Sequence, residues 1–93
     1  MTSGATMTTI PDKPFLSRLF RMQWEETQGA YVLLYPEGMV KLNQSAAEIL
    51  KRCDGQRSVP AIVDELEQAF KASGLGADVD EFLRSACARG WLA

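Results

Sequence analysis

The 93-residue sequence contains no histidine and only two cysteines, and both features exclude large classes of function. Histidine is the commonest general base and the commonest metal ligand in proteins. Two cysteines at unrelated positions cannot supply a zinc ligand set at the usual spacings. The glycines stand singly or in turns, so the sequence has no glycine-rich phosphate loop. We therefore expect a protein that is not an enzyme and holds neither cofactor nor metal.

Long apolar runs are missing as well. No window approaches the ~20 apolar residues that a membrane span needs. Residues 1–14 lack the basic start and the apolar run of a signal peptide. The expectation is a cytoplasmic protein that does not associate with a membrane.

The two cysteines, Cys53 and Cys87, fall on the apolar faces of expected helices. Burial as free thiols is the simpler interpretation, because an unpaired cysteine behaves as a small apolar residue. A disulfide between them stays open at this level, although nothing in the sequence indicates secretion.

Length and composition predict one small domain. A hydrophobic content of 46% is ordinary for a soluble fold and allows a modest core. Residues 1–13 are small and polar, and we expect a disordered N-terminal tail there. Residues 14–93 should form the domain.

The first part of this domain has the pattern of strands. Phe20, Met22 and Trp24 alternate with polar neighbours, which predicts a half-buried strand. Residues 30–35 (AYVLLY) are continuously apolar and in part β-branched or aromatic, which predicts a buried central strand. The sequence does not decide whether Trp24 and Trp91 are core or partner-facing aromatics.

A turn and a short third strand follow. Pro36 and Gly38 suit a tight turn. Residues 39–42 then alternate, with Val40 and Leu42 on one face and Met39 and Lys41 on the other. The result is an antiparallel meander whose first and third strands lie at the edges.

Helical periodicity replaces alternation after residue 43. Ser45 and Glu48 match a capping box for the first helix, although Asn43 could cap it instead. A second helix should begin near Ser58 and a third at Asp78. The expected fold is α+β and winged helix-turn-helix-like, with a three-stranded antiparallel meander followed by three helices.

A winged-helix arrangement raises nucleic-acid binding as one alternative, and the charges argue against it. Residues 59–93 contain six acidic and three basic side chains, a net charge of −3. Nucleic-acid readers gain most of their affinity from phosphate neutralisation and are usually basic. Acidic residues at 78, 80 and 81 open the helix that would approach phosphate. We therefore expect no nucleic-acid partner.

The segment YPEGMVKLN, followed by AAEIL, CDG and the closing GWL, resembles the PqqD family over roughly residues 14–92. This family is the small peptide-chaperone component of pyrroloquinoline quinone (PQQ) biosynthesis. The resemblance rests on the combination of these motifs at these intervals rather than on any single one.

The resemblance implies a function and two partners. PqqD-like domains are similar to the recognition elements of ribosomally made peptide pathways, which hold a leader peptide as an added strand beside a helix. It implies that this chain binds the precursor peptide PqqA and presents it to PqqE. PqqE is the radical S-adenosylmethionine enzyme that joins a glutamate and a tyrosine side chain of the peptide. Binding of the quinone product or an intermediate in the same groove stays open.

A peptide held in this way needs a free strand edge and a neighbouring apolar wall. We expect the third strand to supply the edge and the third helix the wall. Lys41 would attract an acidic peptide, Met39 would adapt to apolar side chains, and Arg84 would clamp a carboxylate. An exposed edge, core packing and a solvated arginine are the alternative interpretations. The expected binding residues are Gly38, Met39, Val40, Lys41, Leu42, Leu83, Arg84 and Cys87.

Overall fold

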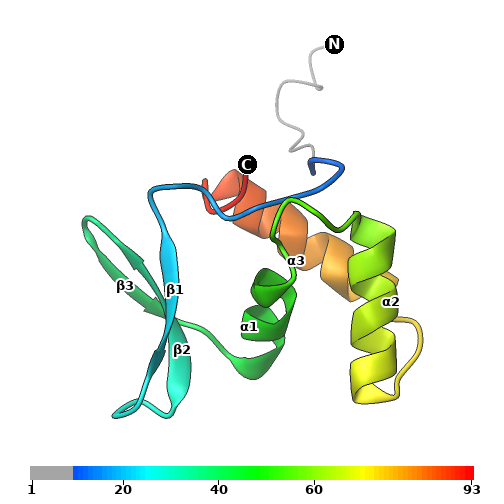
Figure 1. Ribbon diagram of the computed structural model, residues 1–93, viewed down its shortest axis with the longest axis horizontal. Coiled ribbons are helices and arrows are strands. Elements are labelled where there is room, and N and C mark those ends of the chain that lie inside the picture. The colour runs from blue at the N-terminus through cyan, green and yellow to red at the C-terminus, as the bar shows by residue number, and fades with distance from the viewer. Residues whose placement is uncertain (1–9) are drawn as a thin grey trace.

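The computed structural model of the protein describes residues 10–93. Within them the chain forms, in order, β1 (Arg21–Glu25), β2 (Ala30–Tyr35), β3 (Gly38–Lys41), α1 (Gln44–Lys51), α2 (Val59–Phe70) and α3 (Gly76–Ala88). The strands make one antiparallel sheet in the order β1-β2-β3, and α1 stands between this sheet and α2 (Figure 1). The predicted α+β fold is confirmed. Most of the expected tail, residues 1–9, lies outside the described residues.

The sheet is built around β2, which has apolar residues on both of its faces. Val32 and Leu33 are adjacent in sequence, point to opposite faces and are both fully buried. Leu33 joins the core beneath the helices, together with its neighbour across the sheet, Val40. The continuous apolar run of residues 30–35 therefore forms the central strand, as predicted.

One apolar cluster holds the sheet and the helices together. Leu33 and Leu42 enter it from the sheet side, and every helix contributes at least two buried side chains. The buried helical members are Ala46, Ala47, Ile49, Leu50, Ile62, Leu66, Val79, Leu83 and Ala86. No helix among residues 10–93 has the length and apolar character needed to cross a membrane.

Two helix starts differ from the capping pattern of the sequence. Asn43, rather than Ser45, caps α1, because its Oδ1 accepts the backbone N–H of Ala46 at 2.7 Å. α3 begins at Gly76, two residues before the expected Asp78. A side chain from α2 contacts this start: Oε2 of Glu67 accepts the backbone N–H of the N-cap residue Leu75 at 3.0 Å.

A short segment before β1 joins motifs that are far apart in the sequence. The carbonyl of Pro14 accepts the N–H of Gly55 at 3.0 Å, and the N–H of Ser17 donates to the carbonyl of Trp91 at 2.8 Å. Gly55 has a φ of +78°, and an added Cβ would meet the Phe15 side chain at 3.5 Å. The CDG and GWL motifs therefore meet at this segment, which runs beside the C-terminus (Figure 1).

Both cysteines are free thiols. Cys53 is buried, and its Sγ lies 3.4 Å from the carbonyl of Ile49. Burial raises the pKa of Cys53 to about 12, and burial also raises the pKa of Cys87. Because the thiolate is the reactive form, neither side chain is set up as a nucleophile near neutral pH.

Candidate functional site

The outer edge of β3 carries backbone groups that are directed away from the sheet. In an antiparallel pair, residues that bond to the neighbouring strand alternate with residues whose N–H and C=O point outward. The N–H of Leu42 donates to the carbonyl of Tyr31 at 2.9 Å, which fixes the phase of this alternation. Val40 therefore bonds to β2, whereas Met39 and Lys41 direct their N–H and C=O groups outward. Among residues 10–93 no further strand pairs with this edge.

A groove of about 250 Å³ lies between this strand and α3. We call it the β3–α3 groove. On its strand side, Val40 and Leu42 direct their side chains to the helix side, and Lys41 lies between them with its side chain on the other face. Its lining residues are Val40, Lys41, Leu42, Asn43, Ala46, Phe82, Ser85, Ala86, Arg89 and Trp91.

The expected strand residues lie at or beside the groove, whereas the expected helix residues do not line it. Val40, Lys41 and Leu42 line the groove, and Gly38 and Met39 begin the same strand. Met39 exposes 51% of its surface, which fits the expectation of an exposed edge.

The expected helix residues do not line the groove. Leu83 is fully buried in the core. Arg84 lies roughly 200° around the helix from the groove residue Phe82, and it pairs with Asp80 at 2.8 Å on the outer surface. Cys87 is partly buried against the core. The helix places one face in the core and the adjacent face in the groove, and the sequence pattern did not separate these two faces.

The helix wall of the groove contains residues that the sequence pattern did not identify as a site. Phe82 and Trp91 pack edge to face with ring centroids 6.5 Å apart, and the guanidinium of Arg89 lies 5.4 Å from the Trp91 ring centroid. The sequence signal that could have identified this wall is the helical spacing of residues 82, 85, 86 and 89, which places them on one face of α3 next to the face that enters the core. Trp91, whose place the sequence left open, is buried, whereas Trp24 is half exposed.

A second hollow, of about 360 Å³, opens where the three helices meet. We call it the three-helix pocket. The first turn of α1 and the start of α3 form two of its sides, and the end of α2 closes it. Its lining residues are Gln44, Ser45, Ile49, Leu66, Phe70, Ala72, Leu75, Asp78 and Val79.

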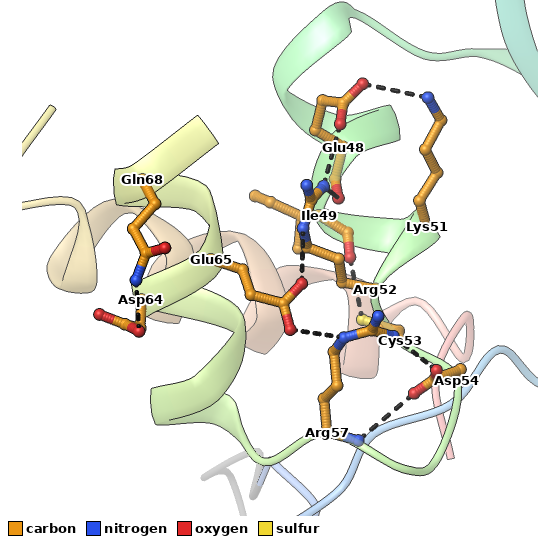
Figure 2. Close-up of polar contacts among 10 residues, drawn as sticks. All are labelled: Glu48, Ile49, Lys51, Arg52, Cys53, Asp54, Arg57, Asp64, Glu65 and Gln68. Atoms are coloured by element: carbon orange, nitrogen blue, oxygen red, sulfur yellow. Dashed lines mark hydrogen bonds and ion pairs between the residues drawn. The ribbon is translucent and has the colours of Figure 1, made fainter. Parts of the chain in front are cut away.

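A network of ion pairs joins the end of α1 and the segment after it to α2 (Figure 2). Arg52 bridges Glu48 at 2.9 Å and Glu65 at 3.3 Å, and Arg57 reaches the other oxygen of Glu65 at 2.7 Å. Hydrogen bonds from Arg52, then from Lys51, lower the pKa of Glu48, so this carboxylate stays charged well below neutral pH. The network therefore links the C-terminal end of α1 and the segment after it to α2.

Other potential sites have weaker geometry. β1 is also an edge strand, but the hollow beside it is lined by the segment before β1, by the start of β1 and by the end of β2 with Pro36, not by a helix. Among residues 10–93, no group of three or more histidine, cysteine, aspartate or glutamate side chains could hold a metal ion. The β3 edge and its groove therefore form the best-defined candidate site, and the arrangement is suited to an extended peptide.

Comparison with known proteins gives concordant matches over most of the chain. Residues 30–92 match the family model described as coenzyme PQQ synthesis protein D (PqqD). The chain is 57% identical over 77 residues to the PqqA binding protein of Methylococcus capsulatus, covering 83% of each chain. It is 56% identical over 86 residues to the PqqA binding protein of Azotobacter vinelandii, covering 91% of this chain and 94% of that one.

A solved structure shares the fold. The solution NMR structure of the PqqD truncation of Methylobacterium extorquens PqqCD superimposes with a TM-score of 0.71 at 27% identity. The match covers 92% of this chain and 96% of that chain. That protein is described as a functional, stand-alone recognition element for ribosomally synthesised and post-translationally modified peptides.

Proposed function

The chain belongs to the PqqD family, and from this premise we propose that it binds a PqqA precursor peptide in PQQ biosynthesis, as a strand added to β3. The relatives named as PqqA binding proteins support the identity of the peptide. The observation that carries the binding mode is the outward direction of the backbone groups of Met39 and Lys41, next to a groove walled by α3. Backbone pairing supplies affinity, and the groove supplies selectivity.

The register of an added strand follows from the alternation in β3. Peptide residues opposite Met39 and Lys41 exchange backbone hydrogen bonds with them and lie with their side chains on the outer face of the sheet. The peptide residue opposite Val40 directs its side chain to the helix side, toward Phe82 and Trp91. An apolar or aromatic side chain fits this position.

Two cations line the groove, one on each wall. Lys41 belongs to the strand and Arg89 to the helix, and among residues 10–93 neither forms an ion pair with an acidic side chain. A bound peptide passes between them. An acidic peptide side chain on the outer face lies near Lys41, and one on the helix side lies near Arg89, so the groove selects a peptide with a carboxylate in or beside its paired segment.

The finer role that we propose is presentation of PqqA to the radical S-adenosylmethionine enzyme PqqE. In this proposal the protein itself is not an enzyme, and the iron–sulfur chemistry belongs to the partner. A peptide held along one edge strand keeps its remaining length free for a second protein. Family membership and the open, one-sided groove support this role.

Calorimetric titration with synthetic PqqA tests the proposed function. We expect a saturable, equimolar complex with a Kd in the micromolar range or tighter. A Trp24→Phe variant should report the same event through the fluorescence of Trp91, because Trp91 lines the groove. Titration of PqqE into the complex then tests presentation. Absence of both heat and fluorescence change at peptide concentrations well above micromolar would reject peptide binding.

Charge reversal on the helix distinguishes the groove face from the outer face. We expect Arg89→Glu to weaken PqqA binding about fivefold, because it places a negative charge where the peptide carboxylate lies. Arg84→Glu is the matched control, since it makes the same change on the same helix but away from the groove. Calorimetry measures both variants. Equal losses in the two, or a loss in Arg84→Glu alone, would show that the peptide uses a different face of α3.

A further inference from the structure

The three-helix pocket and the β3–α3 groove are both lined by α1 and α3. On α1 they use adjacent faces, with Asn43 and Ala46 in the groove and Gln44, Ser45 and Ile49 in the pocket. Along α3 the lining passes from residues 82–89 in the groove to residues 75–79 in the pocket. The two hollows therefore follow each other along one face of α3.

The chemistry of the pocket differs from that of the groove. Its interior is apolar, with Ile49, Leu66 and Val79 among its walls, and Phe70 at its edge exposes 44% of its surface. Exposed apolar side chains beside an apolar hollow are typical of a binding site for another apolar group. The pocket is open to solvent, and its polar lining comes from the first turn of α1 and from Asp78.

We propose that the three-helix pocket is a second subsite for the same peptide, and that it takes one large apolar side chain as an anchor. This inference rests on the proposed function, because it assumes that the peptide pairs with β3. A strand that pairs with β3 and runs on past Lys41 meets the first turn of α1 and α3, and the wall they form leads to the pocket.

The spacing of the two subsites predicts the spacing in the peptide. About eight residues separate the middle of the α3 lining of the groove from the middle of the α3 lining of the pocket, which corresponds to roughly 12 Å at ~1.5 Å per residue. An extended peptide covers this distance in about four residues. The anchor should therefore lie about four residues beyond the segment that pairs with β3.

The charges that line the two hollows predict an uneven distribution of charge along the bound peptide. Lys41 and Arg89 line the groove, whereas Asp78 lines the pocket. A peptide with its carboxylate in the groove and a neutral or basic residue near the anchor fits both ends. The reversed placement puts like charges together at both ends, so the same pattern also fixes the direction of the peptide.

A double-mutant cycle with PqqA tests the anchor. We expect Phe70→Ala to weaken binding about fivefold, because it removes part of the pocket wall from the end of α2. Replacing the anchor residue of PqqA by alanine should cost a similar factor in the wild-type protein and little further in Phe70→Ala. Leu19→Ala is the matched control, since Leu19 is an exposed apolar residue that lines neither hollow.

Methyl and amide NMR spectra of the wild-type protein supply an independent result that does not depend on a variant. PqqA should shift the methyl signals of Leu66 and Val79 together with the amides of residues 39–41. If the amides shift while these methyl signals and the Phe70→Ala affinity stay unchanged, the anchor is wrong and peptide binding at β3 stands. If neither set shifts and no binding is measured, the proposed function itself fails.

Discussion

Met39→Pro should abolish most PqqA binding while the protein stays folded. The N–H of Met39 points away from β2, so proline at this position removes no hydrogen bond from the sheet. It does remove a donor that an added strand needs, and its ring occupies the space where that strand would lie. We expect a loss of at least about tenfold in affinity, measured by calorimetry.

The matched control for this substitution is Met39→Ala. It truncates the same side chain but keeps the outward N–H, so it should weaken binding only slightly. Circular dichroism and thermal unfolding should show that both variants keep the wild-type fold. The β3 edge is not the peptide site if a folded Met39→Pro protein binds PqqA as tightly as Met39→Ala does.

Leu83→Ala should lower the free energy of unfolding by about 2–5 kcal/mol, the range for deletion of a buried leucine side chain. Leu83 is fully buried and belongs to the cluster that joins the sheet to all three helices. Small domains are stabilised by only about 5–15 kcal/mol in total, so this loss is a large share. Urea unfolding followed by circular dichroism measures it.

The same variant separates core packing from binding. Under conditions where Leu83→Ala is folded, its affinity for PqqA should stay within about twofold of the wild type, because the side chain does not line the groove. Arg84→Ala is the neighbouring control and should change the unfolding free energy by less than about 0.5 kcal/mol. A stable Leu83→Ala protein with greatly weakened binding would show that Leu83 takes part in peptide binding.

The sequence predicted the strands better than the start of the third helix. Residues 30–35 are apolar on both faces, and such a run has few alternatives to a central strand. The start of α3 was placed at Asp78, but the helix begins at Gly76, next to Leu75, whose backbone N–H donates to Glu67 of α2. A contact between two helices cannot be read from the pattern of one of them.

The β3–α3 groove contains three of the expected strand residues and none of the expected helix residues. On β3 a period of two leaves only two faces, so Val40 and Leu42 were separated correctly from Met39 and Lys41. On α3 the period of 3.6 leaves several adjacent stripes, and Leu83 was assigned to a groove that Phe82 and Arg89 line. Which stripe faces the core depends on where the sheet and α1 lie.

The sequence by itself determined the fold class, the order of the elements, the open third strand and, through its motifs, the family. These properties depend on local patterning and on residue types, both of which can be read from a single sequence. Only the tertiary structure decided which face of α3 meets β3, and that the CDG and GWL motifs meet at the segment around Phe15. Only the tertiary structure placed the three-helix pocket and the β3–α3 groove next to each other along α3. The physical reason is that the packing of distant segments decides whether a side chain lies in the core or lines a groove. This packing minimises the exposed apolar surface of the whole domain rather than that of one element.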